Sequence, residues 1–177
     1  MPALRDGTRP ERRTCGLNSL RNIALVLLAP VLVAACRDDP QAALLEGAWV
    51  CTSDAPDYAL TRQVSYAPDG TLSGRTGVES TDAEAAVAMQ FAISGTWAVT
   101  NGTLSEKLET HRLMRFAREG KNIPLSELPT GFITEVESTL AGQAAQYQIV
   151  TISAEKLVLS AVAEDLKATC EKEEEGK

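Results

Sequence analysis

Most of the chain after residue 45 consists of short stretches in which apolar and polar residues alternate. Val64 and Tyr66, for example, alternate with polar neighbours, as expected of a strand with one face on a core. Similar strand-like patterns occur in the segments 47–53, 61–77, 89–108, 147–153, 156–162 and 166–172. The pattern predicts about eight short strands.

Turn-forming residues separate these strands. Pro68-Asp69-Gly70 predicts a turn inside segment 61–77, and Asn101-Gly102 is a strong signal for a two-residue hairpin. Further turns are predicted at Ser153-Ala154-Glu155 and near Glu164-Asp165. Sequential hairpins favour an up-and-down antiparallel barrel, because a barrel closes on itself and leaves no sheet edge exposed. We therefore expect a mainly all-β fold of eight strands, whose interior holds side chains or one small ligand.

Two stretches depart from simple alternation. Phe132, Val136 and Leu140 recur at helical spacing with Ile133 beside them, which predicts one short amphipathic helix that flanks the sheet. The segment 78–88 fits either a helix or a loop.

After the Asn-Gly turn, four apolar residues share one parity and predict a long strand: Leu104, Leu108, Met114 and Phe116.

An apolar run near the N-terminus is too short to span a membrane. Ile23 to Ala35 contains thirteen uncharged residues and is interrupted by Pro30, whereas a membrane-spanning helix needs about 20 apolar residues. The preceding flank carries five arginines against two acidic residues. A basic flank, a short apolar run and small residues at its end are typical of a secretory signal peptide.

This run ends in Val33-Ala34-Ala35-Cys36, in which an aliphatic residue and two small residues come directly before a cysteine. These four residues resemble the lipobox of bacterial lipoproteins. In that family the chain is cut before the cysteine, and diacylglycerol is attached to its sulfur, so the resemblance implies that Cys36 is the lipid attachment site. Two or three acyl chains anchor a protein stably, because each buried CH₂ contributes about 0.8 kcal/mol. The alternative is an ordinary secretory signal that happens to contain a cysteine.

The lipobox also implies a location and a division of the chain. Arg37, rather than an aspartate, follows Cys36, which in lipoproteins of this kind favours sorting to the outer membrane, on its periplasmic side. We expect a signal peptide, a lipid-anchored tether, a barrel and a disordered acidic tail, at residues 1–35, 36–44, 45–172 and 173–177.

The 142 residues from Cys36 onward are acidic. Five of the 17 basic and two of the 24 acidic residues leave with the signal, so 12 basic residues stand against 22 acidic ones, a net charge of −10. This charge repels phosphate backbones, so nucleic acid is not an expected partner.

Two cysteines remain once Cys36 carries lipid. Cys51 lies in the first predicted strand and Cys170 in the last. In an oxidising compartment they can pair, which would close a loop of about 120 residues and contribute about 4 kcal/mol. Two free thiols are the alternative. A zinc site would need more ligands than two distant cysteines and one histidine provide.

An internal echo suggests a fold family. Gly47 and Trp49 recur as Gly95 and Trp97, where glycine permits close backbone approach and tryptophan fills a barrel end; the alternative is that both indoles simply fill a core. These pairs belong to a series of motifs that reads Leu45-Gly47-Trp49, Tyr66-Asp69-Gly70-Thr71, Gly95-Trp97-Val99-Gly102-Thr103-Leu104, Ile149-Ile152-Ser153-Leu157-Leu159 and Thr169-Cys170-Lys172. In order and spacing, this series resembles the small lipocalin-like lipoproteins of the calycin group.

The resemblance covers residues 45 to 172 and implies how the barrel closes. In the family, an arginine near the end of the last strand often stacks on the first-strand tryptophan. Here Lys172 occupies that place and is expected to cover Trp49, although lysine is a poorer stacking partner than arginine.

The sequence offers little catalytic chemistry. His111 is the only histidine, and no carboxylate is placed to orient it, so an exposed strand histidine is the expected role. Its cationic neighbours should lower its pKa. The sequence contains no phosphate-binding glycine loop, HExxH or CxxC pair, and neither a metal nor a cofactor is expected.

One basic stretch opposes the overall charge. It could contact an anionic headgroup or an acidic ligand through His111, Arg112, Arg115, Arg118 and Lys121. The alternative is a solvated strand face paired with acidic residues.

Two functional hypotheses follow, and neither is enzymatic. The family resemblance implies a binding module that holds a small apolar or amphipathic ligand inside the barrel. The alternative is an envelope interaction or inhibitor protein with a filled barrel that works through its surface on an envelope protein partner. A continuous apolar cavity above roughly 300 Å³ would favour the first hypothesis, and a solidly packed interior the second.

Overall fold

The computed structural model describes residues 39–80, 82, 86–163 and 166–173. The predicted signal peptide, Cys36, the predicted turn at Glu164-Asp165 and the acidic tail after Glu173 lie outside the described residues. The elements are α1 (Pro40–Leu45), β1 (Gly47–Asp54), β2 (Tyr58–Tyr66), β3 (Thr71–Ser80), β4 (Val87–Thr100), β5 (Thr103–Arg118), β6 (Lys121–Ile123), the 3-10 helix η2 (Leu125–Glu127), α2 (Phe132–Leu140), β7 (Ala144–Ile152), β8 (Lys156–Ala161) and β9 (Lys167–Lys172).

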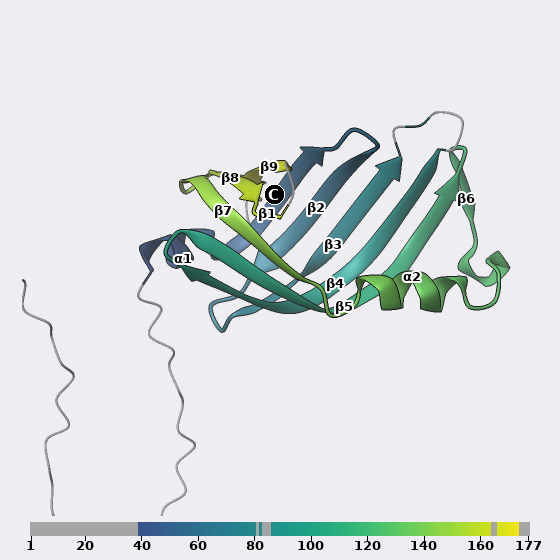
Figure 1. Ribbon diagram of the computed structural model, residues 1–177, viewed down its shortest axis with the longest axis horizontal. Helices are drawn as coiled ribbons and strands as arrows, with labels where there is room; N and C mark the ends of the chain where they lie inside the picture. The colour runs from purple at the N-terminus through teal and green to yellow at the C-terminus, as the bar shows by residue number, and fades with distance from the viewer. Residues whose placement is uncertain (1–38, 81, 83–85, 164–165, 174–177) are drawn as a thin grey trace, which may run out of the picture. The chain divides into compact units, whose positions relative to one another are not determined.

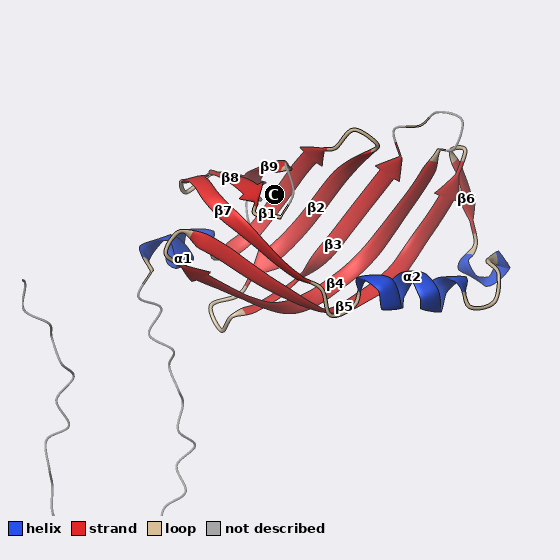
Figure 2. Ribbon diagram, in the orientation of Figure 1, coloured by secondary structure: helices blue, strands red, loops and turns tan. Residues whose placement is uncertain are grey.

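Eight strands form a closed antiparallel up-and-down barrel, which confirms the predicted fold class (Figures 1 and 2). Strands β1, β2, β3, β4, β5, β7, β8 and β9 pair in that order, and β9 pairs with β1 to complete the circle. The short strand β6 lies outside this circle, because it pairs only with the last three residues of β5. The barrel is consistent with the lipocalin-like fold that the motifs suggested.

The two strongest predicted turns are present. Gly70 has a φ of 89° in the β2–β3 turn, where the Asp69 carboxylate accepts a hydrogen bond from the backbone N–H of Thr71. Asn101 and Gly102 have φ values of 51° and 75°, the two positive values that a type I′ hairpin turn requires.

Helix α2 forms where the apolar spacing predicted it. Its half-buried residues Phe132, Ile133 and Val136 pack against the barrel core, and the ring of Phe132 meets that of Phe116 edge-on at 5.4 Å. The ambiguous segment 78–88 contributes its two ends to β3 and β4.

Two bulges in β5 correct the predicted face of that strand. The strand does run for 16 residues, but its pairing with β4 slips twice and leaves Glu109 and Met114 as extra residues. Each extra residue reverses the parity that faces the interior. Leu104 is therefore buried, whereas Met114 is 45% exposed and Leu113 takes the inward position.

A second short helix, α1, precedes the first strand. It spans Pro40–Leu45, within and just after the segment 36–44 that was predicted as a tether. Asp39 caps α1 by accepting a hydrogen bond from the backbone N–H of Gln41, and Pro40 occupies the first turn, where its missing N–H costs nothing. Ala42 and Leu45 are buried against the core.

The barrel interior is filled unevenly. At the end next to α1, large side chains pack without solvent contact, among them Trp49, Leu45 and Leu104. Toward the opposite end, a pocket of about 190 Å³ remains inside the barrel. We call it the interior pocket.

Candidate functional site

The interior pocket is lined by charged, hydroxyl and apolar side chains from most of the barrel strands. Its lining comprises Cys51, Ser53, Leu60, Arg62, Tyr66, Thr76, Glu106, Leu108, His111, Gln143, Ala144, Ala145, Tyr147, Leu159, Leu166 and Ala168. Because inward-facing residues alternate with outward-facing ones along each strand, residues distant in sequence converge on this space. A pocket that combines an apolar wall with a few convergent polar groups is the usual form of a small-molecule site.

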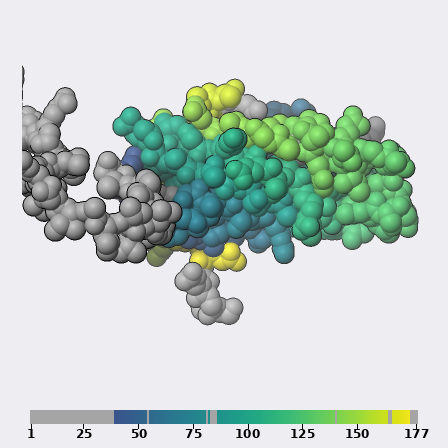
Figure 3. Space-filling view, turned by 90° about the horizontal axis from the view of Figure 1, so that it is seen from below, coloured from purple at the N-terminus to yellow at the C-terminus, as the bar shows by residue number. Residues whose placement is uncertain are grey.

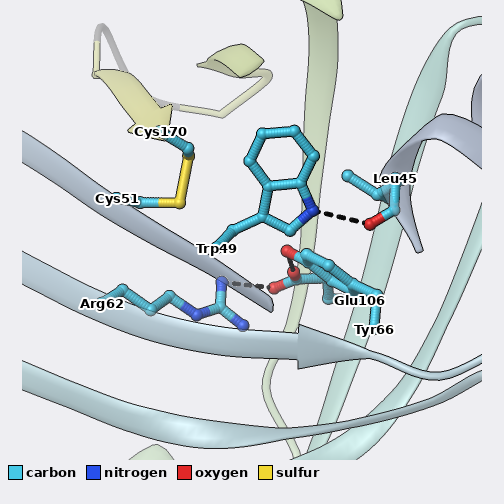
Figure 4. Close-up of a disulfide and its surroundings, with 7 residues drawn as sticks. All are labelled: Leu45, Trp49, Cys51, Arg62, Tyr66, Glu106 and Cys170. Carbon is cyan, nitrogen blue, oxygen red and sulfur yellow. Dashed lines mark hydrogen bonds and ion pairs between the residues drawn. A yellow bond between two sulfur atoms is a disulfide. The ribbon is translucent and has the colours of Figure 1, made fainter. Parts of the chain in front are cut away.

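A buried charged cluster forms the polar wall of the pocket (Figure 4). Arg62 and Tyr66 lie four residues apart on β2 and both point inward, toward Glu106 on β5. The Arg62 Nη1 donates a hydrogen bond to Glu106 Oε2 at 2.7 Å, and the Tyr66 hydroxyl donates to Glu106 Oε1 at 2.5 Å. Glu106 is 3% exposed, so these two donors replace the water that its carboxylate loses.

Burial and the Glu106 charge govern the ionisation of this cluster. Burial alone would lower the pKa of Arg62, but the charge and hydrogen bond of Glu106, together with the nearby Tyr66 and Tyr147, raise that pKa above its ordinary value. Burial raises the pKa of Tyr66, and the negative charge of Glu106 raises it further. Arg62 is therefore a cation and Tyr66 a neutral hydrogen-bond donor at any physiological pH.

Three nitrogen atoms of the pocket lining are buried without a hydrogen-bond partner. They are Nε and Nη2 of Arg62 and Nδ1 of His111. Most buried polar groups in folded proteins have a partner, and each unpaired one costs free energy. A pocket whose lining residues carry unpaired nitrogens is therefore what we expect of a site that binds a polar ligand group.

His111 does not occupy the exposed position expected for it. The bulge at Glu109 changes the inward parity of β5 from even to odd, so His111 turns toward the interior and is half-buried. Its ring meets that of Phe91 edge-on at 5.1 Å. Burial lowers the pKa of His111, and the positive charge of Arg62 lowers it further, whereas the predicted cause was its charged neighbours in sequence.

The other members of the predicted basic stretch stay on the outside. Arg112, Arg115, Arg118 and Lys121 are all exposed, whereas His111 is half-buried. The Arg115 Nε donates to Asn122 Oδ1 at 2.5 Å, and Arg118 Nε lies 3.9 Å from a carboxylate oxygen of Glu119.

Three of the residues assigned to barrel closure, Gly47, Trp49 and Lys172, meet at the α1 end, whereas Gly95 lies against Lys107 and Leu108 of β5. The Lys172 Nζ lies 5.1 Å from the centre of the Trp49 ring, and a Cβ added to Gly47 would lie 2.8 Å from the Lys172 side chain. The Trp49 indole N–H donates to the carbonyl of Leu45 at 2.7 Å. Trp97 is also buried, and its indole donates to the carbonyl of Ala67 at 3.1 Å.

Cys51 and Cys170 form a disulfide, which confirms the pairing that the sequence left open. The two residues are directly opposite each other in the β1–β9 pair, with Cα atoms 3.9 Å apart. The bond thus joins the first and last strands of the barrel where the circle closes.

The interior cluster was not singled out from the sequence. Glu106 lies between Leu104 and Leu108 at a position of inward parity, and Arg62 precedes Val64 and Tyr66 in the same way. The available signal was that each of two strands carries a charged residue at a position whose same-face neighbours are apolar. The pattern alone does not tell which strands face each other across a barrel.

Among the described residues, no group of three or more histidine, cysteine, aspartate and glutamate side chains could hold a metal ion. Within residues 39–173, apart from the positions outside the described set, no helix is long and apolar enough to cross a bilayer. No protein-family model matches the sequence, and a comparison with curated proteins found no similar sequence.

Proposed function

We propose that this chain is a lipid-anchored protein of the bacterial envelope whose barrel binds one small molecule without catalysis. The lipobox resemblance at Val33–Cys36 supports the anchoring, with acyl chains on Cys36. The observation that carries the binding role is the interior pocket, which joins unpaired buried nitrogens to an apolar wall.

The pocket limits the size of this ligand. Its volume of about 190 Å³ is below the roughly 300 Å³ expected for a typical ligand cavity, so a long lipid chain is not favoured. An apolar cavity of about 150 Å³ is enough to bind benzene. We therefore propose a compact ligand, about the size of one substituted ring.

Mass spectrometry of the native protein, extracted from its membrane under mild conditions, tests both parts of the proposal. We expect an N-terminus at Cys36 with added acyl mass, and a small molecule that leaves the protein on denaturation. A full-length, unmodified chain in the cytosol would contradict the anchoring. Purification with one stoichiometric protein partner and no small molecule would contradict the binding role.

A second candidate function uses the outer surface. A groove of about 710 Å³ runs between α2 and the strands β4 and β5, where Arg112 and Glu137 are among its lining residues. In Figure 3 the green surface around α2 borders the teal surface of these strands. Together with the exposed basic residues after Arg112, this groove would suit an envelope protein partner. Cross-linking in intact cells would distinguish this function, because it requires a partner attached at α2 or β5.

A further inference from the structure

The guanidinium group of Arg62 is only partly used. Its Nη1 donates to Glu106, while Nε and Nη2 are buried without a partner. Figure 4 shows Glu106 on one side of the guanidinium, with Nε and Nη2 along another edge. In a planar guanidinium the N–H groups on Nε and Nη2 point the same way, as a parallel pair of donors.

A parallel pair of charged donors fits one kind of partner best. A carboxylate has two coplanar oxygens that accept both N–H groups at once, in the bidentate geometry that makes arginine–carboxylate pairs strong and specific. A hydroxyl or a single carbonyl oxygen would satisfy the edge less completely. A carboxylate also has capacity for further hydrogen bonds, and the unpaired His111 Nδ1 lines the same pocket.

The rest of the pocket fits an apolar body. Besides the charged cluster, its lining includes the apolar side chains of Leu60, Leu108, Ala145, Leu159, Leu166 and Ala168. With a total volume of about 190 Å³, the space beyond a carboxylate is close to that of one aromatic ring or a short alkyl chain.

We propose that the interior pocket binds a small amphipathic monocarboxylate, whose carboxylate accepts two hydrogen bonds from the Nε–Nη2 edge of Arg62. This inference rests on the proposed binding function and names the chemical class of its ligand. Glu106 and the ligand occupy different edges of the guanidinium, so the single cation lies between two anionic groups. The Tyr66 hydroxyl offsets part of the Glu106 charge by its own hydrogen bond.

The test is calorimetric titration of the full chain in detergent with sodium benzoate and with benzyl alcohol, a neutral molecule of similar size. We expect saturable binding of one benzoate per chain, and binding of benzyl alcohol that is weaker by about tenfold or more. In the Arg62→Lys variant, the cation beside Glu106 is kept but the parallel donor pair is lost. Benzoate affinity should then fall by about tenfold or more.

Arg75→Lys is the matched control, because Arg75 is exposed on the outer face of β3 and does not line the pocket. Its benzoate affinity should equal that of the wild type. Thermal unfolding establishes whether Arg62→Lys is folded. As a measurement independent of any variant, the NMR resonance of the Arg62 Nε–H group should shift with benzoate and not with benzyl alcohol.

The outcomes separate this inference from the proposed function. If benzyl alcohol binds as tightly as benzoate, or if folded Arg62→Lys keeps the wild-type affinity, the carboxylate inference is wrong and a binding pocket remains. If neither compound binds, the carboxylate inference is wrong. The ligand search by mass spectrometry then decides the proposed function separately.

Discussion

The two ends of the barrel interior differ in whether their buried polar groups have hydrogen-bond partners. At the α1 end, the indole N–H groups of Trp49 and Trp97 each donate to a backbone carbonyl, and both indoles belong to the buried hydrophobic core. In the interior pocket, Arg62 and His111 keep three buried nitrogens without a partner. The amide oxygen of Gln41 is the only unpaired buried side-chain atom recorded near α1 in the described part of the chain.

This difference distinguishes the residues that stabilise the fold from the residues that are available to bind a ligand. Apolar packing at the α1 end stabilises the barrel in the ordinary way, by removing large surfaces from water. A buried ion pair contributes little net stability, because the loss of hydration offsets the attraction of its charges. Stability therefore does not explain the charged cluster.

The largest effect is expected from Trp49→Ala at the packed end. Trp49 is fully buried, so its removal leaves a large cavity and should lower the free energy of unfolding by about 4 kcal/mol. Urea unfolding monitored by circular dichroism measures this. Val162→Ala is the control, because Val162 is 60% exposed and its loss should change the free energy by less than about 0.5 kcal/mol. A loss of 1 kcal/mol or less in Trp49→Ala would show that the α1 end is not the stabilising part.

The next prediction concerns the charged cluster. Glu106→Leu leaves Arg62, whose side chain is only 16% exposed, as a cation without a counter-ion, and should lower the free energy of unfolding by about 3 kcal/mol in the same measurement. The double variant Arg62→Met, Glu106→Leu removes both charges and should return to within about 1 kcal/mol of the wild type. If the double variant is as unstable as the single one, the cluster is structural and the contrast between the two ends fails.

A smaller loss is expected where two backbones approach closely. A Cβ added at Gly95 would lie 2.1 Å from the carbonyl oxygen of Lys107, so Gly95→Ala must displace β4 from β5. We expect Gly95→Ala to lower the free energy of unfolding, measured by urea unfolding, by about 2 kcal/mol. Gly77→Ala on β3 is the matched control, because its Cβ would meet only atoms at 3.7 Å or more. Equal stability of the two variants would argue against the close approach.

The smallest effect is a pH dependence from His111. The folded state lowers the pKa of His111 below its ordinary value of 6.5, so the unfolded chain binds the proton more readily. The stability it contributes is complete above pH 6.5 and falls as the pH drops toward the folded-state pKa. His111 lines both the interior pocket and the groove beside α2. The other ionisable groups that line these two spaces are Arg62, Tyr66, Glu106, Tyr147, Glu109, Arg112 and Glu137.

Unfolding of the wild type and His111→Gln at pH 7.5 and pH 5 isolates this contribution, since the chain has no other histidine. The wild type should lose more stability than His111→Gln on acidification. A larger loss in the variant would mean that His111 gains, rather than loses, from protonation in the folded state.

The fold was predictable because local signals repeat along the chain. Alternation, the Asn101-Gly102 turn and the spacing from Phe132 to Leu140 each specify one element, and sequential hairpins leave a barrel as the natural closure. The disulfide remained one of two alternatives, because it depends on two strands about 120 residues apart becoming neighbours.

The site was not predictable by the same signals. A bulge is a change of register between two strands, and nothing in the residues around Glu109 marks it. Without it, parity places His111 outside and Met114 inside, the reverse of what is found. Helix α1 was missed for a related reason, since six residues carry too little periodicity to distinguish a helix from a linker.

The disulfide between Cys51 and Cys170 has a consequence for resistance to proteolysis. It joins positions 119 residues apart, so nearly the whole barrel lies within one covalent ring. A protease that cleaves a single surface loop within this ring opens the chain but releases no fragment. The disulfide keeps both pieces covalently joined with their strands paired, so a molecule cleaved at one loop can remain folded.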